Sequence, residues 1–290
     1  DLEGRKLMAI KFNRRKFLKR SMIVGGAGLL TGLYAWQIEP FWLEFVQHKM
    51  PIKNLPNGLN NLKLMQISDM HVGNRFDRQY LIDSMKEAQA LEPDIVVYTG
   101  DFVSYESAEQ FEQLQEVMKH VVRGKLGTVG ILGNHDYGKN WEEGDVADQI
   151  VEILEENGVE MLRNSTTEVA GLNIIGVDDY WATNFDPEQA FKNYDSSKAN
   201  LVLCHNPDVA DLDVWNGYQG WILSGHTHGG QCKPPFLTPP MLPVKNKAYS
   251  AGEVDLEDGR KLYINRALGH LWQVRFNVRP EITVFDLQQA

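Results

Sequence analysis

Cysteine is scarce in this chain of 290 residues. The two cysteines, Cys204 and Cys232, are too few for a disulfide framework, so an apolar core must hold the fold together. One bridge between them is an open alternative, and two separate small thiols are the favoured interpretation. The length and the 43% hydrophobic content suit one large domain or two small ones.

Basic charge is also scarce outside the N-terminus. The chain has 39 acidic and 29 basic residues, and eight of the basic ones lie within residues 1–20. Because a nucleic-acid backbone requires a basic footprint, no nucleic-acid partner is expected and a nuclease is disfavoured. A small phosphate ester remains compatible with an acidic protein, since bound divalent cations invert the local field.

The chain lacks an apolar run of the roughly 20 residues that span a bilayer comfortably. The weakly apolar, glycine-rich stretch Ser21–Trp36 has 16 residues. Arg14 and Arg15 precede it, followed by Phe17 and Lys19. This order resembles a twin-arginine (Tat) export signal, and a basic amphipathic helix is the alternative.

Residues 1–36 are therefore expected to be an export signal or a membrane anchor recognised by the Tat machinery. The folded part would then be periplasmic or lie on the outer face of the cytoplasmic membrane, with membrane association through the N-terminus if the signal is retained. Residues 37–54 form a linker, in which the alternation from Trp42 to His48 indicates a lead-in strand. Residues 55–290 form the main domain.

Apolar runs and helical periodicity alternate along the main domain, and β-rich segments follow. This pattern predicts an α/β fold with two packed sheets and helices outside. The expected helices are 78–90, 108–122 and 146–157, and the expected strands are 62–67, 95–98, 127–132, 168–169, 172–177, 201–204, 221–223, 261–265 and 281–287. Ala170-Gly171 is expected to be the turn of a hairpin.

Five short polar motifs follow these apolar runs. An α/β sheet places its chemistry at the strand ends, so the motifs are expected to converge there. They are Asp69-Met70-His71, Gly100-Asp101, Gly133-Asn134-His135-Asp136, His205 and Gly225-His226-Thr227-His228.

The chemistry of these residues is that of a metal site. Carboxylates and neutral imidazoles bind borderline divalent ions without any thiolate. A spacing of two puts Asp69 and His71 on one side of an extended segment, where both can reach one ion. Asp101 has two oxygens and can bridge two ions. Taken singly, each motif has an ordinary alternative, such as a solvated loop, a turn or a buried structural histidine, and the conjunction of all five favours the metal site.

In order and residue type, the five motifs resemble those of the calcineurin-like metallophosphoesterases over about residues 55–290. That resemblance implies a four-layer αββα sandwich of two mixed sheets flanked by helices, with two divalent ions of manganese, iron or zinc. It also implies roles for the motif residues: Asp69, His71 and His228 at the first ion, Asn134, His205 and His226 at the second, Asp101 as the bridge and His135 as the acid. Asp136 is a candidate for orienting His135, with helix capping or a solvent-facing role as the alternative.

The implied activity is dinuclear metal-dependent phosphoester hydrolysis, in which a metal-activated hydroxide attacks phosphorus. A phosphodiester or a pyrophosphate of a nucleotide-sugar or lipid-linked molecule is the favoured substrate. The alternatives are a broad phosphomonoesterase and a non-catalytic metal-binding module. Phosphoprotein phosphatases continue their second motif with Asp-Arg, whereas Gly100-Asp101 continues with Phe102 here. The sequence segments around His205, His226 and Arg275 resemble those of the Tat-exported bacterial branch of this family.

Substrate contacts are less clearly signalled. The segment from Lys233 to Val244 contains five prolines and follows the last motif directly, so it is expected near the mouth of the site. Phe236 in this segment could grip an acyl chain or rest on a membrane, or simply pack as part of a structural loop. Arg266, Arg275 and Arg279 are candidates for a substrate phosphate, with surface ion pairs as the alternative for each.

Overall fold

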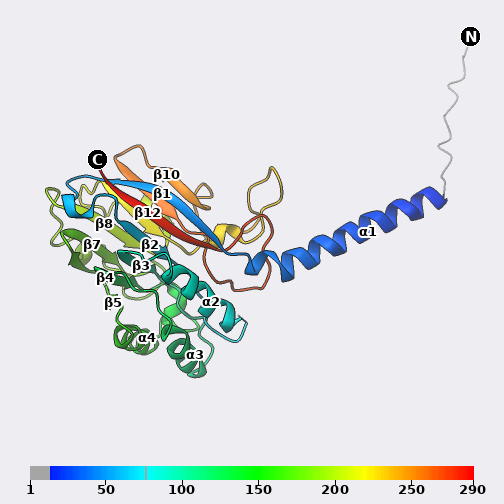
Figure 1. The fold of residues 1–290 in the computed structure, drawn as a ribbon, viewed down its shortest axis with the longest axis horizontal. Coiled ribbons are helices and arrows are strands. Elements are labelled where there is room, and N and C mark those ends of the chain that lie inside the picture. The colour runs from blue at the N-terminus through cyan, green and yellow to red at the C-terminus, as the bar shows by residue number, and fades with distance from the viewer. Residues whose placement is uncertain (1–13, 76) are drawn as a thin grey trace, which may run out of the picture.

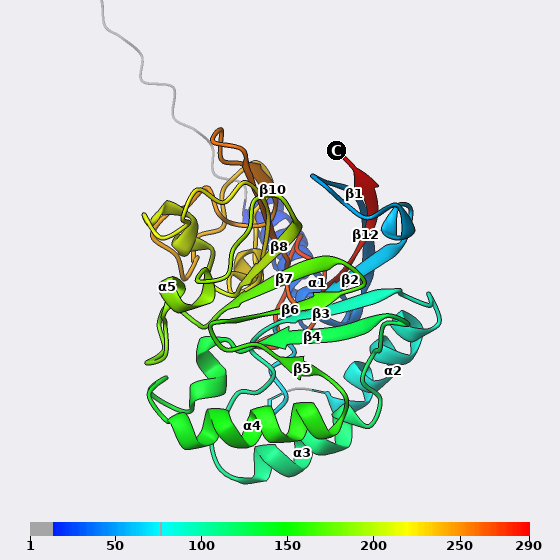
Figure 2. The same cartoon turned by 90° about the vertical axis from the view of Figure 1, so that its left-hand side faces the viewer.

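Two six-stranded sheets pack face to face in the computed structural model, which describes residues 14–75 and 77–290. Helices lie outside the sheets, so the layers follow the αββα order (Figures 1 and 2). The predicted sandwich is therefore confirmed.

The first sheet has the strand order β1-β12-β2-β3-β4-β5. Strands β2 to β5 are mutually parallel, β12 runs antiparallel to β2, and β1 runs parallel to β12. Its strands are β1 (Glu44–Ile52), β2 (Lys63–Ile67), β3 (Ile95–Thr99), β4 (Gly127–Ile131), β5 (Glu160–Met161) and β12 (Glu281–Gln289).

The second sheet has the order β10-β11-β9-β8-β7-β6. Strands β11, β9, β8 and β7 are parallel, and an antiparallel strand closes each edge. Its strands are β6 (Ser165–Val169), β7 (Leu172–Val177), β8 (Ala199–Cys204), β9 (Gly220–Ser224), β10 (Gly252–Asp255) and β11 (Arg260–Ile264).

Helices cover the two outer faces unequally. The first sheet is covered by α2 (Arg78–Gln89), α3 (Glu109–Met118) and α4 (Gly144–Glu156) (Figure 2). The second sheet is covered by the short α5 (Pro187–Ala190), a 3₁₀ turn at Pro207–Asp211 and loops. The α2 helix begins where the sequence predicts, because the Asp77 side chain accepts a hydrogen bond from the Tyr80 backbone N–H at 3.1 Å.

Three apolar layers hold these elements together. In β8, Leu201 and Leu203 face the core between the sheets, whereas Val202 and Cys204 face the outer core of the second sheet. A parallel strand buried on both faces needs apolar residues at successive positions, which explains the continuous apolar runs in the sequence. A third cluster fills the space between the first sheet and its helices.

The predicted hairpin is formed by β6 and β7, paired in antiparallel register. Its two turn residues, Ala170 and Gly171, have φ of 52° and 90°. Positive φ at both positions matches the twist of the flanking strands. Strand β10, which was not predicted, is a solvent-facing edge strand whose Glu253 and Asp255 are exposed, so it leaves no apolar signal in the sequence.

The N-terminal helix α1 (Arg14–Gln37) projects away from the sandwich (Figure 1). Among its residues only Ala35 is buried. Within residues 14–75 and 77–290, no helix combines the length and apolarity that a membrane crossing requires. Residues 1–13, the first part of the predicted export signal, lie outside the described residues.

Candidate metal centre

The five motifs meet where the carboxyl ends of the parallel strands face each other across the two sheets. Asp69, Asp101 and Asn134 follow β2, β3 and β4 of the first sheet, and His205 and His226 follow β8 and β9 of the second. The sheets are joined at this edge, because Gln66 Nε2 donates a hydrogen bond of 2.9 Å to the Ser224 carbonyl. The predicted convergence of the motifs is thus what the structure shows.

Asp69, His71 and His228 form one buried cluster suited to a metal ion. His228 Nε2 lies 3.3 Å from Asp69 Oδ1 and 2.9 Å from His71 Nε2. Carboxylate oxygens and imidazole nitrogens can all act as acceptors. Buried acceptor atoms this close together are stabilised by a bound cation.

Asp101, His205 and His226 form a second buried cluster. Asp101 Oδ2 lies 3.2 Å from His205 Nε2 and 3.6 Å from His71 Nε2, so a single carboxylate oxygen lies between the two clusters. This is the placement that the predicted bridging role of Asp101 requires.

Asn134 provides the test of whether these residues fit a metal. Its side chain is fully buried, and neither of its amide atoms has a hydrogen-bond partner among the described residues. A buried amide without partners is costly, so its oxygen is explained by a metal ligand role. Carboxylate, imidazole and amide donors with no thiolate suit manganese, iron or zinc, and the residues therefore fit a dinuclear divalent site.

Hydrogen bonds from the far side of each imidazole fix which nitrogen is available. His205 Nδ1 donates to the Thr99 carbonyl at 2.6 Å, which leaves Nε2 facing Asp101. His226 Nε2 donates to the Pro243 carbonyl at 3.0 Å, which leaves Nδ1 for the centre. Such outer partners orient metal-binding imidazoles in proteins generally.

Five of the predicted ligands have left-handed backbone conformations. Their φ values are 52° for Asp69, 50° for His71, 54° for Asp101, 71° for His226 and 52° for His228. These conformations are unfavourable for residues with a Cβ, and they persist only where surrounding structure holds them. The strain is concentrated at the site, as expected where side-chain direction matters more than local stability.

Burial keeps two of the imidazoles neutral, whereas the Asp101 carboxylate outweighs burial at His205 and raises its pKa well above the ordinary value. Burial lowers the pKa of His71 well below its ordinary value and that of His226 to about 3, so both imidazoles are neutral. Burial alone would raise the pKa of Asp69, but the nearby His228 outweighs it and lowers that pKa to about 2. Neutral imidazole and ionised carboxylate are the ligating forms.

The predicted acid His135 lies beside the first cluster. Its ring centroid is 5.1 Å from that of His71 in an edge-on arrangement, and its backbone N–H donates to Asp101 Oδ1 at 2.9 Å. The side chain of His135 is therefore free of the ligand set while its backbone supports the bridge.

Of the roles open to Asp136, its hydrogen bonds match capping. Its carboxylate accepts hydrogen bonds from the backbone N–H groups of Phe102, Val103 and Gly133 at 2.8–3.1 Å. It therefore ties the Asp101 loop to the Asn134 loop, and the structure gives no contact with the imidazole of His135. Burial raises the pKa of Asp136 well above its usual range.

None of the four predicted substrate contacts belongs to the two ligand clusters. Arg279 pairs with Glu44 at 3.6 Å, which is the ion pair that was its alternative. Arg275 is fully buried and donates to the backbone carbonyls of Gly269 at 2.6 Å and Val278 at 3.2 Å, so it supports loop structure and is closed to a substrate. Arg266 forms ion pairs with Glu281 and Glu44. Phe236 is fully exposed in the proline-rich segment.

Two tryptophans that the sequence could not assign border the centre. Trp181 packs edge-on against His226 with ring centroids 4.4 Å apart, and Trp141 stacks on Trp181 at 5.2 Å. Trp141 also lies 6.0 Å from His135. Neither indole occurs in a motif, so only the three-dimensional fold shows that the pair forms one wall of the site.

Cys204 and Cys232 are both free thiols.

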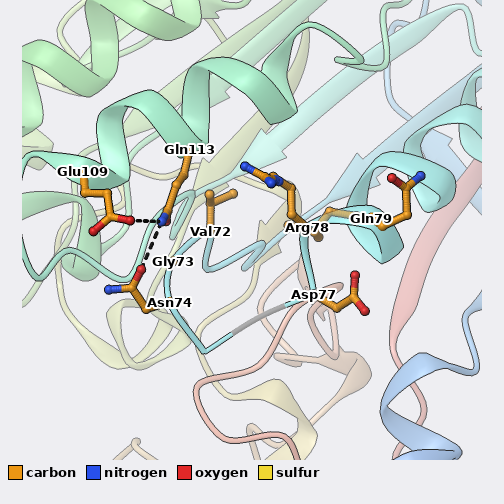
Figure 3. A pocket seen from close by; sticks show the side chains of 9 residues that line it. Val72, Gly73, Asn74, Asp77, Arg78, Gln79, Glu109 and Gln113 are labelled. Atoms are coloured by element: carbon orange, nitrogen blue, oxygen red, sulfur yellow. Dashed lines mark hydrogen bonds between the residues drawn. The ribbon is translucent and has the colours of Figure 1, made fainter.

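A separate polar hollow of about 550 Å³ lies beside the loop that follows His71 (Figure 3). There Gln113 Nε2 donates to Asn74 Oδ1 at 3.0 Å and to Glu109 Oε1 at 3.1 Å. Because these polar groups satisfy one another, the hollow has no evident ligand.

Comparison with known proteins agrees with this geometry. A family model for calcineurin-like phosphoesterases matches residues 62–230, and the chain belongs to that family of phosphoester hydrolases. It is 30% identical to the uncharacterized metallophosphoesterase YkuE of Bacillus subtilis, over 97% of this chain and 99% of that protein.

Two further relatives have names that specify a reaction. The chain is 29% identical to the phosphodiesterase YaeI of Escherichia coli, over 95% of this chain and 99% of the relative. It is 28% identical to the UDP-2,3-diacylglucosamine pyrophosphatase LpxG of Chlamydia trachomatis, over 88% of this chain and 92% of the relative.

The packing at Gly225 gives a test of the centre. A methyl group on this residue would collide with Ser68 Oγ and Asp69 Oδ2. Gly225→Ala should therefore displace the Asp69 carboxylate and weaken metal binding by about 10–100-fold, the range seen when ligand support is lost. Metal per chain, measured after equilibration with limiting manganese, checks this.

Gly144→Ala is the matched control, because nothing lies within 4 Å of a Cβ built there. It should bind metal like the unaltered chain. Equal metal binding by both variants, with circular dichroism showing both folded, would contradict the placement of Asp69 in the centre.

Proposed function

We propose that this chain is a dinuclear metal-dependent hydrolase of a phosphodiester or pyrophosphate carried by a nucleotide-sugar or lipid-linked molecule. The observation that supports it most is the placement of Asp101 between two buried ligand clusters, 3.2 Å from His205 and 3.6 Å from His71. When bound, two such ions lower the pKa of a water molecule and neutralise phosphoryl oxygens.

Residues of the chain position the centre and supply the proton for the leaving group. The Asp101 carboxylate holds the two halves of the centre in fixed relation, since its Oδ1 accepts the His135 N–H and its Oδ2 faces both clusters. His135 lies beside the ligands, and its imidazole belongs to neither ligand cluster. From this position it can donate a proton to the leaving oxygen. The Trp141–Trp181 pair shields one side of the centre from water.

The preference for a diester or pyrophosphate has two supports. The relatives YaeI and LpxG are named as a phosphodiesterase and as a pyrophosphatase of an acylated nucleotide-sugar. In addition, the run after Asp101, from Phe102 to Tyr105, lacks the Asp-Arg pair with which phosphoprotein phosphatases continue this motif, so it offers no arginine to a phosphate.

Substrate comparison tests this proposal. The full chain, purified with manganese supplied, should cleave bis-p-nitrophenyl phosphate and a nucleoside-diphosphate sugar with higher kcat/KM than p-nitrophenyl phosphate. Chelation should abolish all turnover. A preference for the monoester would indicate a phosphomonoesterase, and full metal loading without turnover of any ester would indicate a metal-binding module.

Replacement of His135 tests the acid. His135→Ala keeps the backbone N–H that supports Asp101, so metal content should match the unaltered chain while kcat for bis-p-nitrophenyl phosphate falls by about 10²–10⁴-fold. His120→Ala, at an exposed histidine of α3's C-terminal loop, is the control and should leave kcat unchanged. Unchanged turnover in the His135 variant would remove this residue from the mechanism.

Export is the second part of the proposal. Arg14 and Arg15 begin helix α1, directly ahead of its apolar stretch, and we propose that they address the chain to the Tat machinery. Replacing both with lysine keeps the charge and should leave the protein in the cytoplasm, whereas Arg20→Lys on the same helix should not. Immunoblots of cell fractions give the result, and normal export of the double variant would refute the assignment.

A further inference from the structure

An apolar cavity opens directly onto the candidate metal centre. Its volume is about 640 Å³, and His226, Thr227 and His228 form part of its wall. The opposite wall comes from the proline-rich segment and from the loop after His270. These apolar lining residues are Pro240, Met241, Leu242, Leu271, Trp272 and Val274.

The two segments that line this cavity carry large apolar side chains that face solvent. We call Phe236, Leu237, Met241 and Trp272 the apolar rim. Phe236 is fully exposed, and the exposed fractions of the others are 62%, 79% and 65%. Met241 and Trp272 line the cavity itself. Single exposed apolar residues are common on protein surfaces, but several of them on the segments that line an apolar cavity mark a binding surface.

The two segments that line the cavity carry charges of one sign. Residues 226–252 contain Lys233, Lys245 and Lys247 but no aspartate or glutamate, although acidic residues outnumber basic ones in the whole chain by 39 to 29. Residues 267–280, which form the other wall, likewise contain arginine and no acidic residue. Arg75 lies over the Trp272 ring, 4.9 Å from its centroid. The rim is thus apolar at its tips and cationic at its base.

The same end of the molecule holds the base of helix α1. Arg275 N–H donates to the Ala35 carbonyl at 2.9 Å, and Gln273 Nε2 donates to the Trp36 carbonyl at 3.0 Å, so the loop bearing Trp272 is tied to the end of α1. Figure 1 shows α1 leaving the body beside the loops of residues 233–244 and 267–280. Most of the exposed residues of α1 are apolar or basic, and the helix contains no acidic residue.

From these observations we infer that the apolar rim rests on an anionic lipid membrane and that the cavity takes up the acyl chain of a lipid-linked phosphoester, bringing its phosphate to the centre. Apolar tips beside cationic residues complement a bilayer surface, where acyl chains lie beneath anionic headgroups. A soluble substrate would give no reason for exposed Phe236 and Leu237. The acyl-chain part of this inference rests on the proposed phosphoesterase function, whereas the membrane contact does not.

Vesicle binding tests the membrane contact without any turnover. The full chain should sediment with phosphatidylcholine vesicles that contain phosphatidylglycerol and less with phosphatidylcholine alone. The rim variant Phe236→Ser, Leu237→Ser, Met241→Ser, Trp272→Ser retains α1 and should bind at least about tenfold more weakly. The control variant Leu91→Ser, Leu126→Ser removes two exposed leucines elsewhere, whose exposed fractions are 37% and 47%, and should bind like the unaltered chain.

An equal loss of vesicle binding in the rim variant and the control variant, or no loss of vesicle binding in the rim variant, would overturn the membrane contact. So would a change of the rim variant from dimer to monomer in size-exclusion chromatography without a change in vesicle binding, since the rim would then join two copies of the chain. Unchanged thermal unfolding of the rim variant confirms that it is folded.

Acyl specificity is tested with two esters. The ratio of kcat/KM for p-nitrophenyl hexadecyl phosphate in these vesicles to that for bis-p-nitrophenyl phosphate should fall by about tenfold in the rim variant. An unchanged ratio would overturn the acyl site. If the unaltered, metal-loaded chain hydrolyses neither ester yet binds vesicles through the rim, then the proposed function fails and the membrane contact stands.

Discussion

The Asp101 carboxylate is the interaction on which the rest of the site depends. One oxygen lies 3.2 Å from His205 and 3.6 Å from His71, and the other accepts the backbone N–H of His135. Both imidazoles are buried, at the edge where the two sheets join. Burying carboxylates and imidazoles together is unfavourable unless cations or hydrogen bonds compensate them. The apolar layers of the sandwich hold them in place nonetheless, together with the strained backbone conformations of the ligands.

Much of this arrangement could be predicted from the sequence, for identifiable reasons. Strands such as β8 are buried on both faces and so appear as unbroken apolar runs, and ligands such as His205 follow them directly. The contacts of Asp136 could not be predicted from the sequence. Its carboxylate accepts hydrogen bonds from the backbone N–H groups of Phe102 and Val103, which are 34 and 33 residues away. Arg275 was a candidate for binding a substrate phosphate, because the sequence does not reveal that backbone carbonyl groups enclose its guanidinium. Trp141 and Trp181 reach the site through loop geometry that no motif encodes.

The position of the apolar cavity connects the chemistry to the N-terminal helix. Pro243 accepts the hydrogen bond from His226, so the segment that lines the cavity also orients a metal-binding imidazole. The loop bearing Trp272 is in turn bonded to the end of α1. The apolar cavity, the segment that orients His226 and the end of the N-terminal helix therefore share one end of the molecule, which is consistent with the proposed delivery of a substrate from a membrane surface.

The central claim is that one carboxylate joins two metal ions. Anomalous diffraction from crystals grown with manganese tests it most directly. The account predicts two peaks roughly 3.5–4 Å apart, with Asp101 between them. One peak should lie beside Asp69, His71 and His228, and the other beside Asn134, His205 and His226. A single peak, or two peaks too far apart to share Asp101, would contradict the account.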